Sequence, residues 1–151
     1  MKKKIVFIFP GQGSQYTGMC KTIIKKYPLE SKMFDKANDL LGYNIKNIIL
    51  ENPDDKLNKT TYTQPAIYIV SFLLFNILKK EGIIPKVVAG HSLGEYTALA
   101  AANVYSFDEG LKIVQKRGLI MDKVAQKGGG AMAAVIGLDT YKIESICQKI
   151  E

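Results

Sequence analysis

The feature that most constrains this chain is a short apolar run that ends in a glycine–serine turn. Residues 87–96 are Val-Val-Ala-Gly-His-Ser-Leu-Gly-Glu-Tyr, in which Gly90, Ser92 and Gly94 match the pattern Gly-x-Ser-x-Gly. This pattern marks a tight turn from a strand into a helix that exposes a nucleophilic serine. Glycine is needed on both sides because a Cβ there would crowd the helix against the strand. The pattern therefore predicts a strand, a sharp turn with Ser92 at its tip, and a helix.

The flanking residues agree with this prediction. Residues 83–89 form a β-branched run after a turn signal, and residues 96–102 are mostly small residues that suit a closely packed helix. The start of that helix would direct free N–H groups and a positive dipole end at Ser92, where an oxyanion could develop. The alternative is that Ser92 only caps the helix after a glycine turn.

Length and composition indicate one globular domain. The chain has 151 residues, which is enough for a hydrophobic core, and 47% of them are hydrophobic, which argues against disorder. The longest apolar stretch, residues 66–78, is too short to span a bilayer, and the N-terminus lacks a signal-peptide pattern, so we expect no membrane contact.

Cys20 and Cys147 lack metal-ligand spacing; we expect reduced thiols, no metal site and a cytoplasmic protein.

The net charge of +7 has two interpretations. Lysines scattered over solvated faces would account for it without any partner. Alternatively, the charge attracts an anionic partner. Nucleic acid is not expected, because the sequence has no dense stripe of lysine and arginine with interleaved aromatic residues.

The N-terminal strand and the loop after it form a second candidate region. Residues 5–9 are a continuous apolar run, typical of a parallel strand buried on both faces. Residues 11–15, Gly-Gln-Gly-Ser-Gln, follow at once. They match neither a dinucleotide fingerprint, since position 16 is tyrosine, nor a phosphate-binding P-loop. The loop is either a plain turn or a site at a strand end, where open α/β sheets place their ligands.

Between the two strands, helices are expected at residues 19–27, 29–41 and 60–80, with a third short turn at residues 45–50 before the last of them. The segments before residue 60 carry no recognisable chemistry and would cover the sheet. The helix at residues 60–80 is apolar almost all round beyond its first turn, which predicts a helix buried in the body of the fold. Gln64 is the only amide at its N-terminal end.

A long helix is expected from a cap at Asp108 to about Gln126. Arg117 lies on its predicted apolar stripe, which consists of Ile113, Val114, Ile120, Met121 and Val124. A guanidinium that faces inward cannot lose its charge, so it needs a carboxylate from the protein or from a ligand. Two other arrangements would also satisfy the pattern. Arg117 could form a structural ion pair, or its aliphatic chain could pack on the protein while its guanidinium reaches water.

The C-terminal residues predict the start of a second lobe. Residues 127–130 suggest a flexible break, residues 131–137 a strand and residues 140–151 a helix. One strand and one helix cannot form an independent core. We therefore expect residues 1–126 to form the core and residues 127–151 to be the incomplete beginning of a small lobe.

Four motifs, taken together, resemble the malonyl-CoA:acyl carrier protein transacylases and the acyltransferase domains of polyketide synthases. The resemblance covers the chain from Lys4 onward and rests on Phe9-Pro10-Gly11-Gln12-Gly13-Ser14-Gln15, Thr63-Gln64-Pro65-Ala66, Gly90-His91-Ser92-Leu93-Gly94-Glu95-Tyr96 and Gln115-Lys116-Arg117-Gly118. It implies an α/β fold with an α/β-hydrolase-like parallel-sheet core. It also implies a ferredoxin-like lobe inserted after the long helix, of which this chain would hold only the start.

The resemblance implies a role for each motif. Ser92 would be the nucleophile that takes the acyl group as an ester. Gln12 and the backbone N–H of Leu93 would bind the oxyanion, and Arg117 would pair with the free carboxylate of a malonyl group. His91 and Gln64 would lie behind these groups in supporting positions.

The implied reaction is the transfer of a malonyl group from CoA to the phosphopantetheine thiol of acyl carrier protein, in fatty acid biosynthesis. It would proceed in ping-pong order through the serine ester. A guanidinium fork suits a planar carboxylate and would select malonyl over acetyl groups. No permanently bound cofactor is implied, the CoA thioester being a substrate, and the basic charge suits both CoA and an acidic carrier.

The sequence departs from the family in two respects. Family members use a histidine far downstream as the general base, whereas this chain has one histidine, His91, next to Ser92. Adjacent side chains on a strand point apart, so we expect a hydrogen-bonded turn histidine there. Family chains are also about twice as long. We therefore expect a truncated chain that is inactive or slow unless another chain supplies the missing half, with an apolar seam that favours self-association.

Two other functions remain open at this point. A serine hydrolase or esterase would use the same turn but would have no need of an inward arginine. A non-catalytic fragment would only bind or fold with a partner chain.

Overall fold

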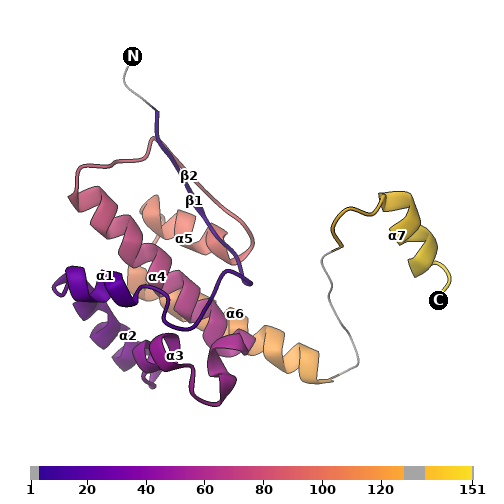
Figure 1. Cartoon of the computed structure of the whole chain (residues 1–151), viewed down its shortest axis with the longest axis horizontal. Coiled ribbons are helices and arrows are strands. Elements are labelled where there is room, and N and C mark those ends of the chain that lie inside the picture. The colour runs from indigo at the N-terminus through magenta and orange to yellow at the C-terminus, as the bar shows by residue number, and fades with distance from the viewer. Residues whose placement is uncertain (1–3, 128–134, 151) are drawn as a thin grey trace.

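Two parallel strands form the sheet in the computed structural model, which describes residues 4–127 and 135–150. They are β1 (Val6–Phe9) and β2 (Val87–Gly90), and the register pairs Val6 with Val87 and Phe9 with Gly90. Because the strands run in the same direction, their carboxyl ends meet at one edge of the sheet, and Figure 1 shows them side by side. The expected parallel α/β arrangement is confirmed for the described residues.

Helices make up most of the described chain. Between the strands lie α1 (Lys21–Lys26), the 3-10 turn η1 (Glu30–Lys32), α2 (Met33–Leu41), α3 (Ile45–Glu51), a second 3-10 segment η2 (Pro53–Asn58) and α4 (Thr60–Lys80). After β2 come α5 (Leu93–Ala101), α6 (Phe107–Lys127) and α7 (Thr140–Cys147). The segment predicted as one helix at 29–41 is therefore divided at Met33. It ends as expected at Gly42, whose φ of 78° suits glycine.

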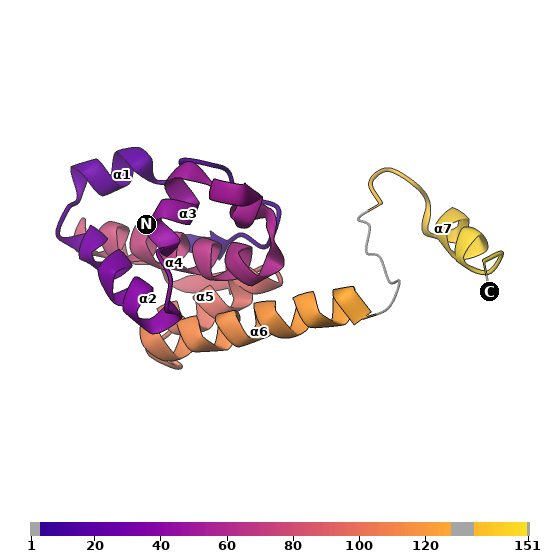
Figure 2. The ribbon, with the colours of Figure 1, turned by 90° about the horizontal axis from the view of Figure 1, so that it is seen from below.

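The core is organised around α4. Twelve of its 21 residues are buried, and it packs against α2, α3, α5 and α6. Figure 2 shows α6 running along one side of the helical body with α4 and α5 beside it. Among the described residues, α4 alone is long and apolar enough to cross a membrane, but most of that stretch is buried inside the protein. The prediction of a buried helix is confirmed.

The start of α6 differs from the prediction. Ser106 rather than Asp108 caps this helix: the backbone N–H and the hydroxyl of Ser106 both donate to Glu109 Oε2, at 2.8 and 2.7 Å, and the N–H of Glu109 donates to Ser106 Oγ at 3.3 Å. This reciprocal pair is a capping box. Asp108 lies in the first turn instead, with its Oδ1 2.7 Å from Nζ of Lys36.

The buried face of α6 also differs from the predicted stripe. Three members of that stripe are exposed, whereas the residues that α6 buries are Gly110, Leu111, Val114 and Gly118. The exposed members are Ile113, Ile120 and Val124. The physical reason is close helix packing: a Cβ on Gly118 would lie 3.0 Å from the carbonyl oxygen of Thr60. The buried face of α6 therefore combines two glycines, which let α4 approach, with the apolar side chains of Leu111 and Val114.

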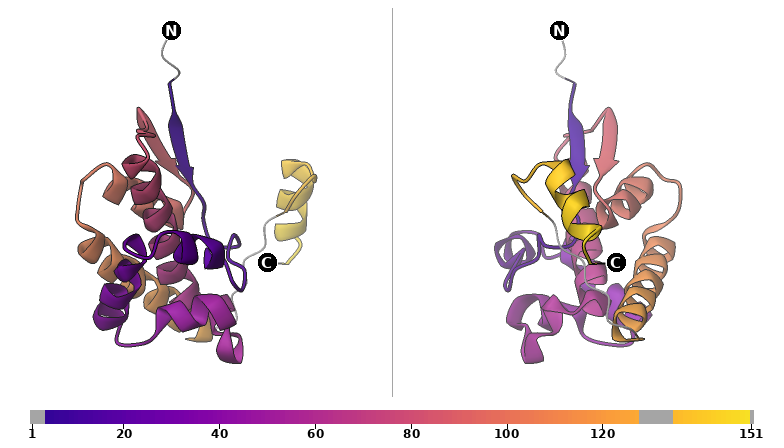
Figure 3. Two further views of the ribbon diagram at one scale, coloured as in Figure 1. Left: turned by 60° about the vertical axis from the view of Figure 1, so that its left-hand side comes forward. Right: turned by 90° about the vertical axis from the view of Figure 1, so that its right-hand side faces the viewer.

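One face of the sheet is exposed, although β1 was expected to be buried on both. Phe7 and Phe9 pack edge-on against Phe75 of α4, with ring centroids 6.2 and 6.3 Å apart. Val6 and Ile8 point the other way, and their side chains are 52% and 75% exposed. Figures 1 and 3 show the strand pair projecting past the helical body. Within the described residues, no element covers this second face.

The C-terminal predictions are only partly within the described residues. Residues 131–134 of the strand predicted at 131–137 lie outside them, and residues 135–137 form no strand. The predicted helix is present as α7, and none of its residues is buried. Cys20 and Cys147 are both free thiols.

Gly94 allows the start of α5 to approach the end of β1. A Cβ at this position would overlap the carbonyl oxygen of Phe9 and lie 2.8 Å from that of Pro10. A Cβ on Gly90 would in turn overlap the backbone of Gly94 and Glu95. Both glycines therefore have the steric role that the turn pattern predicted.

We predict that Gly94→Ala lowers the free energy of unfolding by about 1–3 kcal/mol, because strand and helix must move apart to admit the methyl group. Urea unfolding followed by circular dichroism measures this change. Leu99→Ala, on the exposed side of the same helix, is the matched control and should cost about 0.5 kcal/mol or less. An alanine variant as stable as the wild type would contradict the close approach.

Candidate functional site

Ser92 stands at a strained turn between β2 and α5. Its φ of 51° and ψ of −107° are unfavourable for a residue with a side chain, and it is exposed. Its side chain makes no capping hydrogen bond to α5. Instead, Ser92 Oγ accepts a hydrogen bond from Arg117 Nη2 at 3.2 Å. Ser92 therefore occupies the N-cap position of α5, but its side chain does not cap the helix.

The backbone N–H of Leu93 is next to this hydroxyl. Leu93 is the first residue of α5, and the N–H groups that follow it, of Gly94 and Glu95, are bonded to the carbonyls of His91 and Ser92 at 2.9 and 3.2 Å. Within the described residues the N–H of Leu93 has no such partner. A free N–H in the first turn of a helix is the donor that an oxyanion requires.

Gln12 lies on the loop that follows β1, at the sheet edge where β2 also ends. Its side-chain Nε2 donates to Thr60 Oγ1 at 3.0 Å, at the start of α4. Its backbone N–H has no hydrogen-bond partner within the described part of the chain. The side-chain amide of Gln12 is therefore used in holding the loop to α4, and the backbone N–H is the group left available for a ligand.

Arg117 faces the serine, as the sequence predicted. Its Nη1 donates to Gln64 Oε1 at 2.7 Å, its Nη2 donates to Ser92 Oγ, and its Cζ lies 5.5 Å from the centroid of the Tyr96 ring. The residue is half-buried. No carboxylate among the described residues lies within ion-pair distance of it, since the ion pairs there involve only lysines. The alternative of a structural ion pair is not seen.

His91 is not hydrogen-bonded in the way that was expected. Its backbone N–H donates to the carbonyl of Phe9 at 3.1 Å, but its ring forms no hydrogen bond with any described residue. The ring lies against the loop after β1, where a Cβ on Gly11 would be 2.9 Å from Nδ1. The absence of a side chain at Gly11 therefore leaves room for the ring. The ring makes no hydrogen bond to Ser92 that would let it act as a base.

Two residues of the site were not identified from the sequence. Tyr96 provides the aromatic face beside Arg117, and Met121 accepts a hydrogen bond from Gln64 Nε2, with the sulfur 3.2 Å away. Met121 lies four residues after Arg117 on α6, and Tyr96 lies in the first turn of α5, four residues after Ser92. The i, i+4 spacing that places side chains on one helix face could have indicated them.

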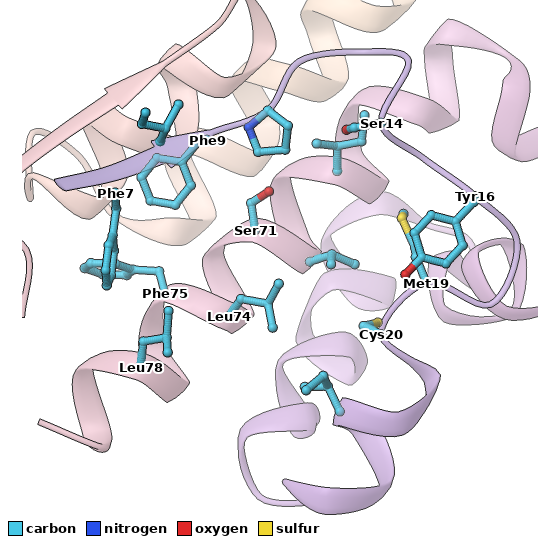
Figure 4. A pocket seen from close by; sticks show the side chains of 15 residues that line it. Phe7, Phe9, Ser14, Tyr16, Met19, Cys20, Ser71, Leu74, Phe75 and Leu78 are labelled. Atoms are coloured by element: carbon cyan, nitrogen blue, oxygen red, sulfur yellow. The ribbon is translucent and has the colours of Figure 1, made fainter. Parts of the chain in front are cut away.

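A hollow in the described structure lies apart from this site. It measures about 400 Å³ and lies between β1, the loop after it, α1 and α4, lined mainly by apolar side chains (Figure 4). None of Ser92, Gln64 and Arg117 lines it. Burial raises the pKa of the Cys20 thiol in its wall to about 11, so this thiol stays protonated and unreactive near neutral pH.

Comparison with known proteins identifies the family. Residues 6–149 match the family model described as the acyl transferase domain. The chain is 41% identical to a malonyl CoA-acyl carrier protein transacylase of Haemophilus influenzae, over 99% of this chain and 48% of that protein.

Two solved structures agree. That of the malonyl CoA-acyl carrier protein transacylase from Coxiella burnetii matches with a TM-score of 0.89 and 39% identity, over 97% of this chain and 47% of that one. The malonyl-transacylase PlMCAT, solved in complex with the type II PKS acyl-carrier protein AntF, matches with a TM-score of 0.89 and 37% identity, over 98% and 48%. The chain spans about half the length of each of these relatives. It belongs to the acyl transferase domain family.

Proposed function

We propose that Ser92 takes a malonyl group from CoA and passes it to the phosphopantetheine thiol of an acyl carrier protein, in fatty acid biosynthesis. The observation that carries this proposal is the guanidinium of Arg117, which is half-buried, has no carboxylate of its own among the described residues, and lies within hydrogen-bond distance of Ser92 Oγ. A malonyl group joined to Ser92 carries a carboxylate that such a guanidinium can bind. The names of the relatives, and the solved complex of one with a carrier protein, support the choice of substrates.

The chemistry consists of two matched steps. In the first, Ser92 Oγ bonds to the thioester carbonyl carbon, the carbon–sulfur bond of CoA breaks, and the hydroxyl proton ends on the departing sulfur. The backbone N–H groups of Leu93 and Gln12 would stabilise the oxyanion of the tetrahedral intermediate. In the second step the sulfur of the carrier's thiol bonds to the ester carbonyl carbon, the bond between that carbon and Ser92 Oγ breaks, and the proton of the carrier's thiol ends on Ser92 Oγ. No permanently bound cofactor takes part, and the net positive charge favours both anionic partners.

The proton transfer needs a base that the described site does not provide. These 151 residues contain one histidine, and its ring makes no hydrogen bond to Ser92 within the described structure. We expect acylation of Ser92 by this chain alone to be slow, and to be accelerated by a base supplied from outside these residues.

The finer features of the fold belong to the same proposal. Residues 1–126 would form an α/β-hydrolase-like core, residues 127–151 would begin a small ferredoxin-like lobe, and the protein would be cytoplasmic. The strained serine between β2 and α5 supports the first of these features, and the two free thiols are in keeping with the last.

Binding of thioesters tests the proposed function without requiring turnover. Isothermal titration calorimetry should show that the chain binds malonyl-CoA more tightly than acetyl-CoA. Arg117→Ala should weaken malonyl-CoA binding about 100-fold, because charge-assisted hydrogen bonds worth about 3 kcal/mol in total are lost. Its effect on acetyl-CoA should be small. Lys116→Ala, which removes the same charge from the exposed neighbour, is the matched control and should change neither affinity by more than about twofold.

The same variants separate the transferase from a serine esterase. In an esterase, Arg117→Ala would leave the hydrolysis of a neutral ester such as p-nitrophenyl acetate unchanged and the two CoA thioesters would bind equally.

Intact-mass measurement after long incubation with malonyl-CoA should show a malonyl adduct that is absent from Ser92→Ala. Equal binding of both thioesters by the wild type would contradict the proposed function.

The uncovered face of the sheet suggests that the chain also associates with itself. Exposed apolar side chains of β1 and β2, including Val6, Ile8 and Val87, form a continuous surface, and such surfaces drive association in water. Light scattering should give an average mass above the 16.7 kDa of one chain, rising with concentration. Ile8→Lys should lower it, whereas Tyr141→Lys on α7, which changes a side chain of similar exposure, should not. A single monomeric species at all concentrations would disprove this association.

A further inference from the structure

Gln64 is a fully buried amide that contacts two residues of a neighbouring helix. It lies in the second turn of α4, with no exposed surface. Its Oε1 accepts from Arg117 Nη1 at 2.7 Å and its Nε2 donates to Met121 Sδ at 3.2 Å. Arg117 and Met121 are four residues apart and therefore lie on one face of α6. Both ends of the amide are thus fixed by the same face of α6.

The packing of α4 against α6 keeps this amide in place. Gly118 brings the two helices together, since a Cβ there would lie 3.0 Å from the carbonyl oxygen of Thr60 and 3.2 Å from Cα of Thr61. Thr61 Oγ1 also donates to Asp122 Oδ2 at 3.2 Å. The first turns of α4 therefore cannot move away from α6 without breaking several contacts. Gln64 is consequently a rigid support and not a mobile surface side chain.

The neutrality of this support matters as much as its position. A buried glutamate in the same place would hold the guanidinium equally well but would also cancel its charge. The amide accepts one N–H of Arg117 and leaves the positive charge uncompensated among the described residues. The Tyr96 ring beside the guanidinium is neutral too. Each of the contacts that this guanidinium makes with Gln64, Ser92 and Tyr96 therefore orients it without neutralising it.

We propose that Gln64 is the positioning residue for Arg117: it fixes Nη1, directs Nη2 towards Ser92, and keeps the charge available for the carboxylate of the acyl group. This assignment rests on the proposed function and explains why an arginine is used. A guanidinium can bind Gln64 through one nitrogen and a ligand through another, whereas an ammonium is a single point. Of the 21 lysine and arginine residues in the chain, Arg117 is the only arginine.

Two variants with opposite chemistry test the assignment. Gln64→Met keeps the volume but removes the acceptor, so Arg117 loses its anchor. Gln64→Glu keeps the acceptor but neutralises the charge. Each should weaken malonyl-CoA binding at least about tenfold, the loss expected from one charge-assisted hydrogen bond. Acetyl-CoA binding should change by less than about twofold, because the acetyl group makes no use of the guanidinium. Calorimetric titration measures both affinities, and circular dichroism with thermal melting checks that each variant is folded.

The controls separate positioning from a general effect on structure or charge. Gln126→Glu adds the same charge at an exposed position of α6 and should leave both affinities unchanged. If the wild type prefers malonyl-CoA and Gln64→Met, folded, keeps that preference, the assignment of Gln64 is overturned while the proposed function stands. If the folded variant binds both thioesters equally weakly, its role is structural and the assignment also fails. If the wild type itself shows no preference, the proposed function fails first.

Discussion

The site depends on one constraint: a guanidinium cannot give up its charge, so a half-buried arginine must be given partners. Arg117 of α6 has two, Gln64 of α4 and Ser92 at the start of α5, and an aromatic neighbour in Tyr96. One side chain thereby connects three helices at the point where the strained serine is exposed. Because the two hydrogen-bond partners are uncharged, the connection leaves a positive charge beside a hydroxyl, which is the arrangement that an acyl group bearing a carboxylate would complete.

The rest of the site depends on the close approach of two backbone segments, the start of α5 and the end of β1. The absence of a side chain at Gly94 brings the start of α5 against the end of β1, so that two loops from adjacent parallel strands share one edge of the sheet. That edge carries the N–H groups of Leu93 and of Gln12, which are unpaired within residues 4–127 and 135–150. Sequence, strand order and site are therefore linked: parallel pairing brings the two loops to the same edge, and glycine lets them come close enough to serve one ligand.

Short sequence motifs predicted the turn at Ser92. The features that the sequence did not predict depend on how the helices and strands pack against one another. The turn around Ser92 follows from short-range spacing, so the sequence was sufficient for it. Arg117 faces Ser92 as predicted, although Ile113, Ile120 and Val124 of the stripe that placed it there are exposed. Three of the five residues predicted for the buried face of α6 are exposed, because Gly118, which the apolar pattern ignores, sets the approach to α4. The burial of β1 was also overestimated. An apolar run shows that a strand could be buried on both faces, but it does not show whether another element packs against each face. Among the described residues, only one face of β1 is covered. The ring of His91 lies where a side chain on residue 11 would be, so Gly11 leaves space for it, and the expected hydrogen bond is not formed among the described residues.

The central claim is that the Arg117 guanidinium binds the carboxylate of a malonyl thioester beside Ser92. Because the chain contains a single arginine, arginine-selective ¹⁵N labelling gives one guanidinium spin system, observable by NMR without further assignment. Addition of malonyl-CoA to the Ser92→Ala variant should shift its Nη signals and slow rotation about its Cζ–N bonds, while acetyl-CoA at the same concentration should leave them nearly unchanged. Identical spectra with both thioesters under saturating conditions would contradict the claim.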